Sequence, residues 1–283
     1  QRRFRYFGKE ECALVKTAWG CGFECSFCYC ARLNGGKYQV RNMPKVIEEI
    51  AALPQKRIFI IDDNFLAAKA RVLEFCNLIQ AHQIQKNFSV YGRADFICAN
   101  AAILPRLREA GIDEVIVGLE SIDDKTLQSY NKQVSADTNL QAVKLLHEHG
   151  ISTCGLFIVG QDYGVEDFRQ LARTVKQMKL ANCMFSIFTP LKGVPGYEDY
   201  QERLVSPPDF FENLDFLHLT LRPGKLNVAR FYFEFYRLYA VAYLDWYRIK
   251  HNALPLLRSL KNLALENIKG FLSGQGQQKN FGG

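Results

Sequence analysis

Apolar, β-branched and aromatic residues gather in short runs along the first two thirds of the chain, and most runs are followed by a stretch with helical periodicity. Short apolar runs bounded by turn residues are typical of buried strands, whereas apolar positions three or four apart indicate helices. The predicted strands are residues 13–19, 57–62, 88–93, 114–119, 153–159 and 183–189. The predicted helices are residues 43–53, 67–83, 100–110, 123–130, 136–149 and 165–180.

This alternation predicts a parallel sheet, because strands that recur with a helix between them form βαβ units. Asn42 and Pro44 mark a helix start, while Gly111 and Gly150 mark helix ends. A nucleotide-binding Rossmann sheet is the alternative, but no predicted strand is followed by a G-x-G-x-x-G sequence. The pattern therefore indicates an α/β fold of six strand–helix units.

The pattern changes after residue 190, where turn-rich sequence precedes two predicted helices at residues 228–250 and 255–271. We divide the chain into a linker-like segment (1–12), the α/β region (13–195), a loop and helical extension (196–272) and a tail expected to be disordered (273–283).

Composition and charge indicate an ordinary globular protein with an unevenly charged end. Hydrophobic residues make up 48% and charged residues 23% of the chain. Nine cysteines without a signal peptide suggest a reducing compartment, so we expect a cytoplasmic protein. The net charge of +7 arises from Arg222 onward, and residues 1–221 are neutral overall, so nucleic-acid binding by the α/β region is not expected. The chain begins with Gln, which suggests a start inside a longer product or after processing.

Cys21, Cys25 and Cys28 form a C-x3-C-x2-C run directly after the first predicted strand. A 4Fe-4S cluster that is fully ligated by protein uses four cysteines. Three thiolates therefore leave one iron open for a small molecule. Gly20 and Gly22 allow the backbone to wrap closely around such a cluster.

Three other interpretations compete with an open-iron cluster. A zinc site needs a second Cys or His pair, and neither the five histidines nor the isolated cysteines Cys12, Cys76, Cys98, Cys154 and Cys183 supply one. Cys30 could be a fourth ligand, which would make the chain a non-catalytic electron carrier, although its spacing from Cys28 is short. Finally, the triplet could form one face of a helix, but the flanking glycines oppose this.

With this triplet after its first strand, the sequence resembles the radical S-adenosylmethionine (radical SAM) superfamily, which often has an aromatic residue, here Phe27, before the last cysteine. The resemblance implies a partial (β/α)6 barrel over residues 13–195 with a C-terminal helical extension. It also implies one 4Fe-4S cluster, bound SAM and a one-electron donor such as flavodoxin or ferredoxin. Reductive cleavage of SAM would give a 5′-deoxyadenosyl radical that removes hydrogen from an unactivated carbon.

Polar residues follow the predicted strands at the ends where parallel barrels bind ligands. Asp62, Asp63 and Asn64 end the second strand, where the resemblance implies binding of the SAM ammonium group, and a carboxylate suits a cation. The common G-G-E sequence is missing, so either aspartate is a candidate. Arg93 and Asp95 end the third strand, where they form either a structural ion pair or part of the site.

Glu120 and Ser121 end the fourth strand, and Lys132 follows twelve residues after Glu120. The resemblance implies that the position of Glu120 is a Gln or Glu in related enzymes. It also implies that a basic residue near the position of Lys132 binds the SAM carboxylate. The alternative for an isolated lysine is a solvated surface position.

Gly160 and Pro190 end segments that resemble the adenine-lining segments of the superfamily. Leu156 stands where some members carry a ribose-binding acid, which puts ribose recognition in doubt.

Segments between residues 2 and 245 also resemble the cobalamin-dependent (class B) methyltransferase branch, including hopanoid C-methylase-like proteins. They are RRFRYFG, GGKYQVRNMPKVIEEI, IIDDNF, YGRADFI, VGLES, NKQVS, FSIFTPLKG and LDFLHLTL. That branch carries a cobalamin domain with a D-x-H-x-x-G loop, which this sequence lacks, and it often shows Ser, Arg and Pro where this chain has TAWGCGF. We expect radical methylation with cobalamin from a missing or separate domain. The alternative is a cobalamin-independent rearrangement, dehydrogenation or bond formation.

Tyr232, Tyr236, Tyr239, Tyr243 and Tyr247 share one face of the helix predicted after residue 228. Either this face packs over the barrel with its hydroxyls paired, or the region rests peripherally on the inner membrane and admits a lipid-like substrate. The expected substrate is a small or lipid-like molecule. An RNA-modifying methylthiotransferase is a further alternative, but no RNA-binding appendage is evident.

Overall fold

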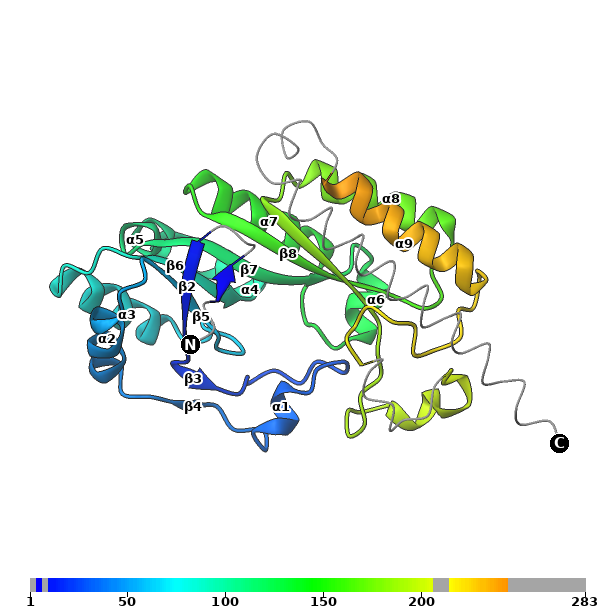
Figure 1. The fold of residues 1–283 in the computed structure, drawn as a ribbon, viewed down its shortest axis with the longest axis horizontal. Coiled ribbons are helices and arrows are strands. Elements are labelled where there is room, and N and C mark those ends of the chain that lie inside the picture. Colours follow the sequence, from blue (N-terminus) through cyan, green and yellow to red (C-terminus); the bar gives the residue numbers. More distant parts are fainter. Residues whose placement is uncertain (1–3, 7–9, 206–213, 244–283) are drawn as a thin grey trace.

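The computed structural model describes residues 4–6, 10–205 and 214–243. Six parallel strands form a curled sheet whose spatial order follows the chain, and a short antiparallel strand joins its first edge (Figure 1). The strands of this sheet are β1 (Arg5–Tyr6), β2 (Glu10–Val15), β5 (Arg57–Ile60), β6 (Asn87–Gly92), β7 (Ile112–Glu120), β8 (Ser152–Val159) and β9 (Asn182–Ile187). The predicted α/β fold with a six-stranded partial barrel is confirmed.

Most helices lie between successive parallel strands. The helices are α1 (Cys30–Leu33), α2 (Met43–Ala52), α3 (Lys69–Ala81), α4 (Ala94–Ala99), η1 (Ala101–Ile103), α5 (Leu104–Glu109), α6 (Asp124–Ser129), α7 (Ala136–Glu148), α8 (Val165–Gln177), η2 (Tyr197–Arg203) and α9 (Val228–Tyr243). Of these, α1 lies in a small separate ribbon, and η2 and α9 follow the last strand. The Asn42 side chain caps α2 by accepting the Lys45 N–H, as its sequence position predicts. The helix predicted at residues 100–110 is confirmed as η1 followed by α5. The helix α4 before it was not predicted, and it ends at Asn100, whose side-chain amide donates to the Phe96 carbonyl.

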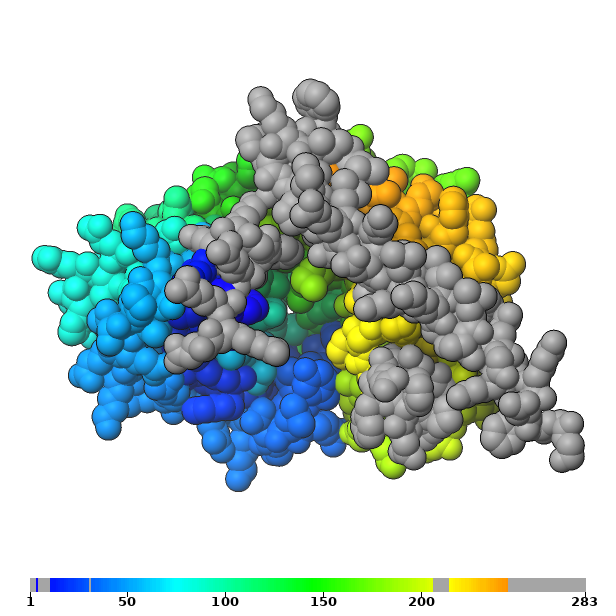
Figure 2. Space-filling view, viewed as in Figure 1, coloured from blue at the N-terminus to red at the C-terminus, as the bar shows by residue number. Residues whose placement is uncertain are grey.

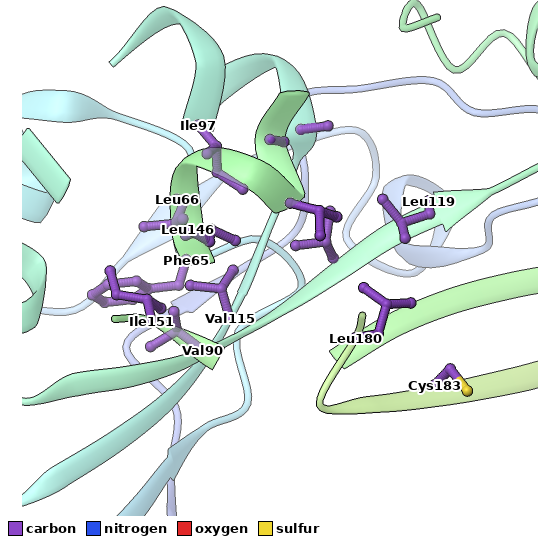
Figure 3. Packing of buried hydrophobic residues seen from close by; sticks show 14 of the residues in the cluster. Phe65, Leu66, Val90, Ile97, Val115, Leu119, Leu146, Ile151, Leu180 and Cys183 are labelled. Atoms are coloured by element: carbon purple, nitrogen blue, oxygen red, sulfur yellow. The ribbon is translucent and has the colours of Figure 1, made fainter. Parts of the chain in front are cut away.

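The main core lies between the sheet and its helices (Figure 3). Val90 of β6, Val115 of β7 and Leu146 of α7 are completely buried there. Because side chains alternate along a strand, Ile116 and Cys154 face the other way and belong to a second apolar cluster on the inner face of the curled sheet. Burial on both faces explains why these strands appear in the sequence as nearly continuous apolar runs.

A small ribbon of β3 (Ala18–Trp19) and β4 (Gln39–Val40) stands apart from the main sheet and brackets the cysteine loop. The strand predicted at residues 13–19 is therefore divided: β2 ends at Val15 and β3 pairs elsewhere. In Figure 1 this ribbon and α1 lie below the sheet, so the cysteine loop projects from the barrel wall instead of continuing it.

Helix α9 lies beside α8 and faces the edge strand β9 (Figure 1). The Tyr239 hydroxyl accepts the Phe185 N–H at 3.0 Å and donates to the Phe185 carbonyl at 2.7 Å. Tyr243 makes the same pair of hydrogen bonds with Cys183. The described tyrosines thus confirm that this face packs over the barrel.

Tyr247, the helix predicted at residues 255–271 and the tail at residues 273–283 lie outside the described residues. Among the residues described, none of the helices combines the length and the apolar character that crossing a membrane requires.

Candidate functional site

Asp62 fastens the start of the cysteine loop to the barrel. It follows β5, is 2% exposed, and accepts the Thr17 N–H at 2.6 Å, the Thr17 hydroxyl at 2.5 Å and the Ala18 N–H at 3.0 Å. Burial raises the pKa of this carboxyl, and the bonds from Thr17 and Ala18 oppose that rise. Both oxygens of Asp62 are therefore committed to shaping the chain before the first cysteine.

Asp63 reaches further into the loop. Its Oδ2 accepts the Gly20 N–H at 2.7 Å, while Oδ1 lies 3.4 Å from Lys16 Nζ, and its side chain is 18% exposed. Gly20 has φ +82°, and a Cβ there would lie 2.1 Å from the Lys37 carbonyl oxygen, so glycine is required. Asp63 is thus the more accessible carboxylate of the pair.

The far end of the loop rests on the residues that follow α6. The Ser26 N–H donates to the Tyr130 carbonyl at 2.9 Å, and the Asn131 amide donates to the Glu24 carbonyl at 2.9 Å. The rings of Phe27 and Tyr130 meet edge to face with centroids 5.1 Å apart. The loop therefore spans from the end of β5 to the segment after α6.

Arg93 connects the end of β6 to the middle of the loop. Its guanidinium carbon lies 3.5 Å from the centroid of the Phe23 ring, and Nη1 donates to Cys25 Sγ at 3.8 Å. Nη2 donates to the Lys132 carbonyl at 2.6 Å, and the Asp95 carboxylate accepts from Nε and Nη2. Arg93 therefore forms the predicted ion pair and also contacts the cysteine loop, while its role in the site stays a prediction.

Glu120 and Lys132 form a buried ion pair beside the loop. Lys132 Nζ lies 2.8 Å from Glu120 Oε1, and the residues are 6% and 8% exposed respectively. Glu120 has φ +60° at a register shift of β7, and a Cβ on Gly118 would lie 2.3 Å from Glu120 Oε1. The Lys132 ammonium lies 5.8 Å from the Phe27 ring centroid, so the solvated alternative for this lysine is wrong.

The thiols of the loop are partly buried. Burial raises the pKa of Cys21 and of Cys25, and the neighbouring cations Arg93 and Lys132 oppose that rise. The pKa of Cys28 falls to about 7, chiefly because the Cys30 thiol donates a hydrogen bond to its sulfur. The Cys30 thiol therefore lies next to Cys28, one member of the triplet.

The donor set fits an iron–sulfur cluster. Within residues 4–6, 10–205 and 214–243, no three His, Cys, Asp or Glu side chains surround a single metal ion. The protein ligands of a polynuclear cluster bind different iron atoms, so they stand further apart than the ligands of one ion. Three thiols in one loop, with two buried cations beside them to offset thiolate charge, have the chemistry that such a cluster requires.

Two cavities lie beside this end of the sheet, where the molecule is hollowed between the blue loop region and the yellow-green segment after β9 (Figure 2). Phe27 and Pro190 line one of about 200 Å³, and Gly160 lines its neighbour of about 360 Å³. The wall common to both consists of Ser129, Tyr130, Phe188 and Tyr200. The Tyr130 and Phe188 rings are nearly parallel, with centroids 6.0 Å apart.

Ser121 and Asn64, two of the predicted site residues, do not contact the cysteine loop in the hydrogen bonds that the structure gives them. Ser121 is 3% exposed and its hydroxyl accepts the Asp123 N–H at 3.1 Å, so it shapes the turn before α6. Asn64 is 3% exposed, and its amide atoms are enclosed without a hydrogen-bond partner in the described part of the chain. Leu156 packs against the inner apolar cluster.

Sequence reasoning missed Thr17, Phe23, Gly118 and Tyr130. Gly118 carried a usable signal, since a glycine inside a strand often marks a bulge or a close approach. Phe23 lies between two cysteines and could have been suspected for that position alone. Thr17 and Tyr130 carried no signal, because their roles depend on contacts with residues more than forty positions and more than one hundred positions away, respectively.

Two curated proteins of similar sequence are methyltransferases by name. The hopanoid C-3 methylase of Methylococcus capsulatus is 25% identical over 244 residues, which cover 86% of this chain and 46% of that protein. The bacteriochlorophyllide d C-8(2)-methyltransferase of Chlorobaculum tepidum is 27% identical over 259 residues, which cover 86% of this chain and 56% of that protein. This chain spans about half the length of these relatives.

A solved structure shares the fold. The radical S-adenosylmethionine methyltransferase TsrM of Kitasatospora setae, determined with tryptophan and a SAM analogue, superposes with a TM-score of 0.60 at 20% identity over 68% of this chain and 38% of that one. The model of the Radical SAM superfamily matches residues 15–175, which is more than half of this chain. The chain therefore belongs to the radical SAM superfamily, whose enzymes use a 4Fe-4S cluster and SAM.

Proposed function

We propose that this chain forms the SAM-cleaving part of a methyltransferase that acts on an unactivated carbon. The observation that carries the proposal is the docking of the three-cysteine loop against two buried cations, Arg93 and Lys132. The two curated methyltransferases, which are similar over most of this chain, support methylation. The bound cofactors supply a 5′-deoxyadenosyl radical, while the residues of this chain hold them, orient them and exclude water.

Cys21, Cys25 and Cys28 are assigned to the cluster, and Asp63 and Lys132 to the two charged ends of the methionine part of SAM. Asp63 is preferred to Asp62 because its Oδ1 has a long and exchangeable contact, whereas Asp62 is committed to Thr17 and Ala18. The Lys132 ammonium is buried beside the loop, where a ligand carboxylate can replace Glu120 as its partner.

The adenine is assigned to the cavity lined by Phe27 and Pro190, because the flat faces of Tyr130 and Phe188 suit a planar base. Gly160 borders the neighbouring cavity and gives the ligand room on that side. An enclosed amide without a partner is costly, so we assign Asn64 a partner that arrives with the ligand.

Other components come from outside this chain in this proposal. Cobalamin belongs to a separate domain or protein, and no residue of this chain is assigned to it, because the sequence has no D-x-H-x-x-G loop. A one-electron donor such as flavodoxin or ferredoxin supplies the electron. The substrate is a small or lipid-like molecule, and the positive charge after Arg222 would allow peripheral contact with an anionic membrane.

The test is an anaerobic reaction of the iron- and sulfide-reconstituted chain with SAM and dithionite, with and without hydroxocobalamin. Mass spectrometry should detect 5′-deoxyadenosine in both reactions, because SAM cleavage requires only this chain. S-adenosylhomocysteine that forms only with cobalamin would support methylation, and absence of 5′-deoxyadenosine from both reactions would overturn the proposal.

Two variants control this experiment. Cys25→Ala should abolish both products and most bound iron, whereas Cys98→Ala should leave both unchanged, since Cys98 lies on α4 outside the triplet. Undiminished deoxyadenosine from Cys25→Ala would overturn the assignment of the site.

A further inference from the structure

Arg93 makes more contacts with the cysteine loop than a simple ion pair requires. Its partner Asp95 lies two residues away and already satisfies Nε and part of Nη2. The remaining donor, Nη1, points to Cys25 Sγ, and the flat face of the guanidinium covers the Phe23 ring. The side chain is only 7% exposed, so water screens this charge weakly.

Arg93 also joins the two segments that border the triplet. Its Nη2 donates to the backbone carbonyl of Lys132, whose own ammonium pairs with Glu120. One guanidinium thus contacts the middle of the cysteine loop and the base of the lysine that lies over Phe27. The planar fork of arginine permits these simultaneous bonds, and lysine could not make them.

We propose that Arg93 is a positioning residue that fixes the Cys25 thiolate and raises the reduction potential of the cluster. Hydrogen bonds to cluster sulfurs and nearby charge are the protein's principal means of setting that potential. Reduction adds one negative charge to the cluster, and a buried cation beside one thiolate ligand stabilises the more negative state. The inference rests on the cluster common to the superfamily and not on methyl transfer.

The Asp95 carboxylate opposes this effect, which supplies a test of opposite sign. Its negative charge partly cancels the guanidinium, and its side chain is more exposed, at 33%. Arg93→Gln removes the cation and leaves the anion, so the potential should become more negative. Asp95→Asn leaves the cation without its partner, so the potential should become less negative.

The experiment is an EPR-monitored redox titration of the reconstituted full chain for both variants. Arg57→Gln is the matched control, because that arginine also pairs with a partly buried carboxylate but lies at the opposite end of the barrel. We expect shifts of opposite sign for Arg93→Gln and Asp95→Asn and none for Arg57→Gln. Potentials that coincide with wild type in both variants, or that shift in one direction, would overturn the proposal.

A second measurement covers the case in which Arg93→Gln binds no cluster. Hydrogen exchange of residues 21–28 in the cluster-free protein should be faster in Arg93→Lys than in wild type, because lysine keeps the charge but loses the fork. Arg93→Lys should retain most of the wild-type potential while showing this faster exchange. Unchanged exchange in Arg93→Lys would remove the positioning role, and a potential far more negative than that of wild type in Arg93→Lys would remove the charge effect.

Discussion

The two ends of the barrel both hold buried charge, yet they differ in what that charge contacts. At the amino-terminal end of the strands, Arg57 forms two hydrogen bonds with Asp113, of 3.0 and 2.7 Å, and a third with Ser89. Ser89 in turn donates to Glu114, which also accepts from Asn182. These groups all belong to the sheet strands and connect β5, β6, β7 and β9 to one another.

At the carboxyl-terminal end the charges extend beyond the sheet. Asp62 and Asp63 bind the start of the cysteine loop, Arg93 binds its middle, and Lys132 lies over Phe27. The comparison teaches that a buried ion pair alone does not identify a site. The distinguishing feature is contact with a segment that leaves the barrel wall, and the two ends should therefore respond differently to substitution.

The largest effect on stability is expected from Asp62→Ala. It leaves the buried N–H groups of Thr17 and Ala18 without their acceptor, and each such loss costs roughly 1–3 kcal/mol, so the free energy of unfolding should fall by about 3 kcal/mol. Urea denaturation of the reduced, cluster-free chain measures this. Asp63→Ala is the matched control and should cost only about 1 kcal/mol, since it frees a single N–H, that of Gly20, and the Asp63 side chain is itself more exposed than that of Asp62. Equal losses in both variants would contradict the structural role assigned to Asp62.

The next effect concerns SAM affinity, for which Lys132→Met should raise the Kd about 100-fold. Removing one member of a buried charge pair typically costs 2–5 kcal/mol in binding, and part of that cost is the unpaired Glu120 left behind. Equilibrium dialysis of the reconstituted protein against SAM gives the Kd. The double variant Lys132→Met with Glu120→Gln should bind SAM more tightly than Lys132→Met alone. Lys125→Met, on the exposed face of α6, should bind SAM with wild-type affinity. A single variant with wild-type affinity would refute the role of Lys132.

Much of this carboxyl-terminal end could be predicted from the sequence, because its residues follow apolar runs and the triplet has a distinctive spacing. The roles within it could not. Asp62 and Asp63 are equivalent candidates in the sequence. Their roles differ only in the folded chain, where Thr17 donates a hydrogen bond to Asp62. The fold was predictable because its strands are apolar runs, whereas the division of the first predicted strand at Thr17 and the end of α4 at Asn100 depend on side-chain hydrogen bonds of Asp62 and Asn100.

At the amino-terminal end, Arg57→Met should lower the free energy of unfolding by about 2 kcal/mol without changing SAM cleavage. Breaking a fully buried pair costs roughly 3–5 kcal/mol, and this pair is 14% and 22% exposed, which reduces the cost. Denaturation gives the stability, and the yield of 5′-deoxyadenosine per bound cluster gives the activity. A fall in that yield with the cluster content intact would mean that the two ends are coupled.

The smallest effect is expected where α9 meets the sheet edge. A strand edge presents unpaired N–H and C=O groups, and Tyr239 satisfies both groups of Phe185 with one hydroxyl. Tyr239→Phe keeps the ring packed against Phe235 but removes these bonds, so the free energy of unfolding should fall by about 1 kcal/mol. Thermal denaturation of the cluster-free chain is sensitive enough to detect this. Phe233→Leu, at a side chain that is 56% exposed on the same helix, should leave stability unchanged. If both variants unfold at the same temperature, the Tyr239 hydroxyl contributes no stability at this edge, and packing alone holds α9 against β9.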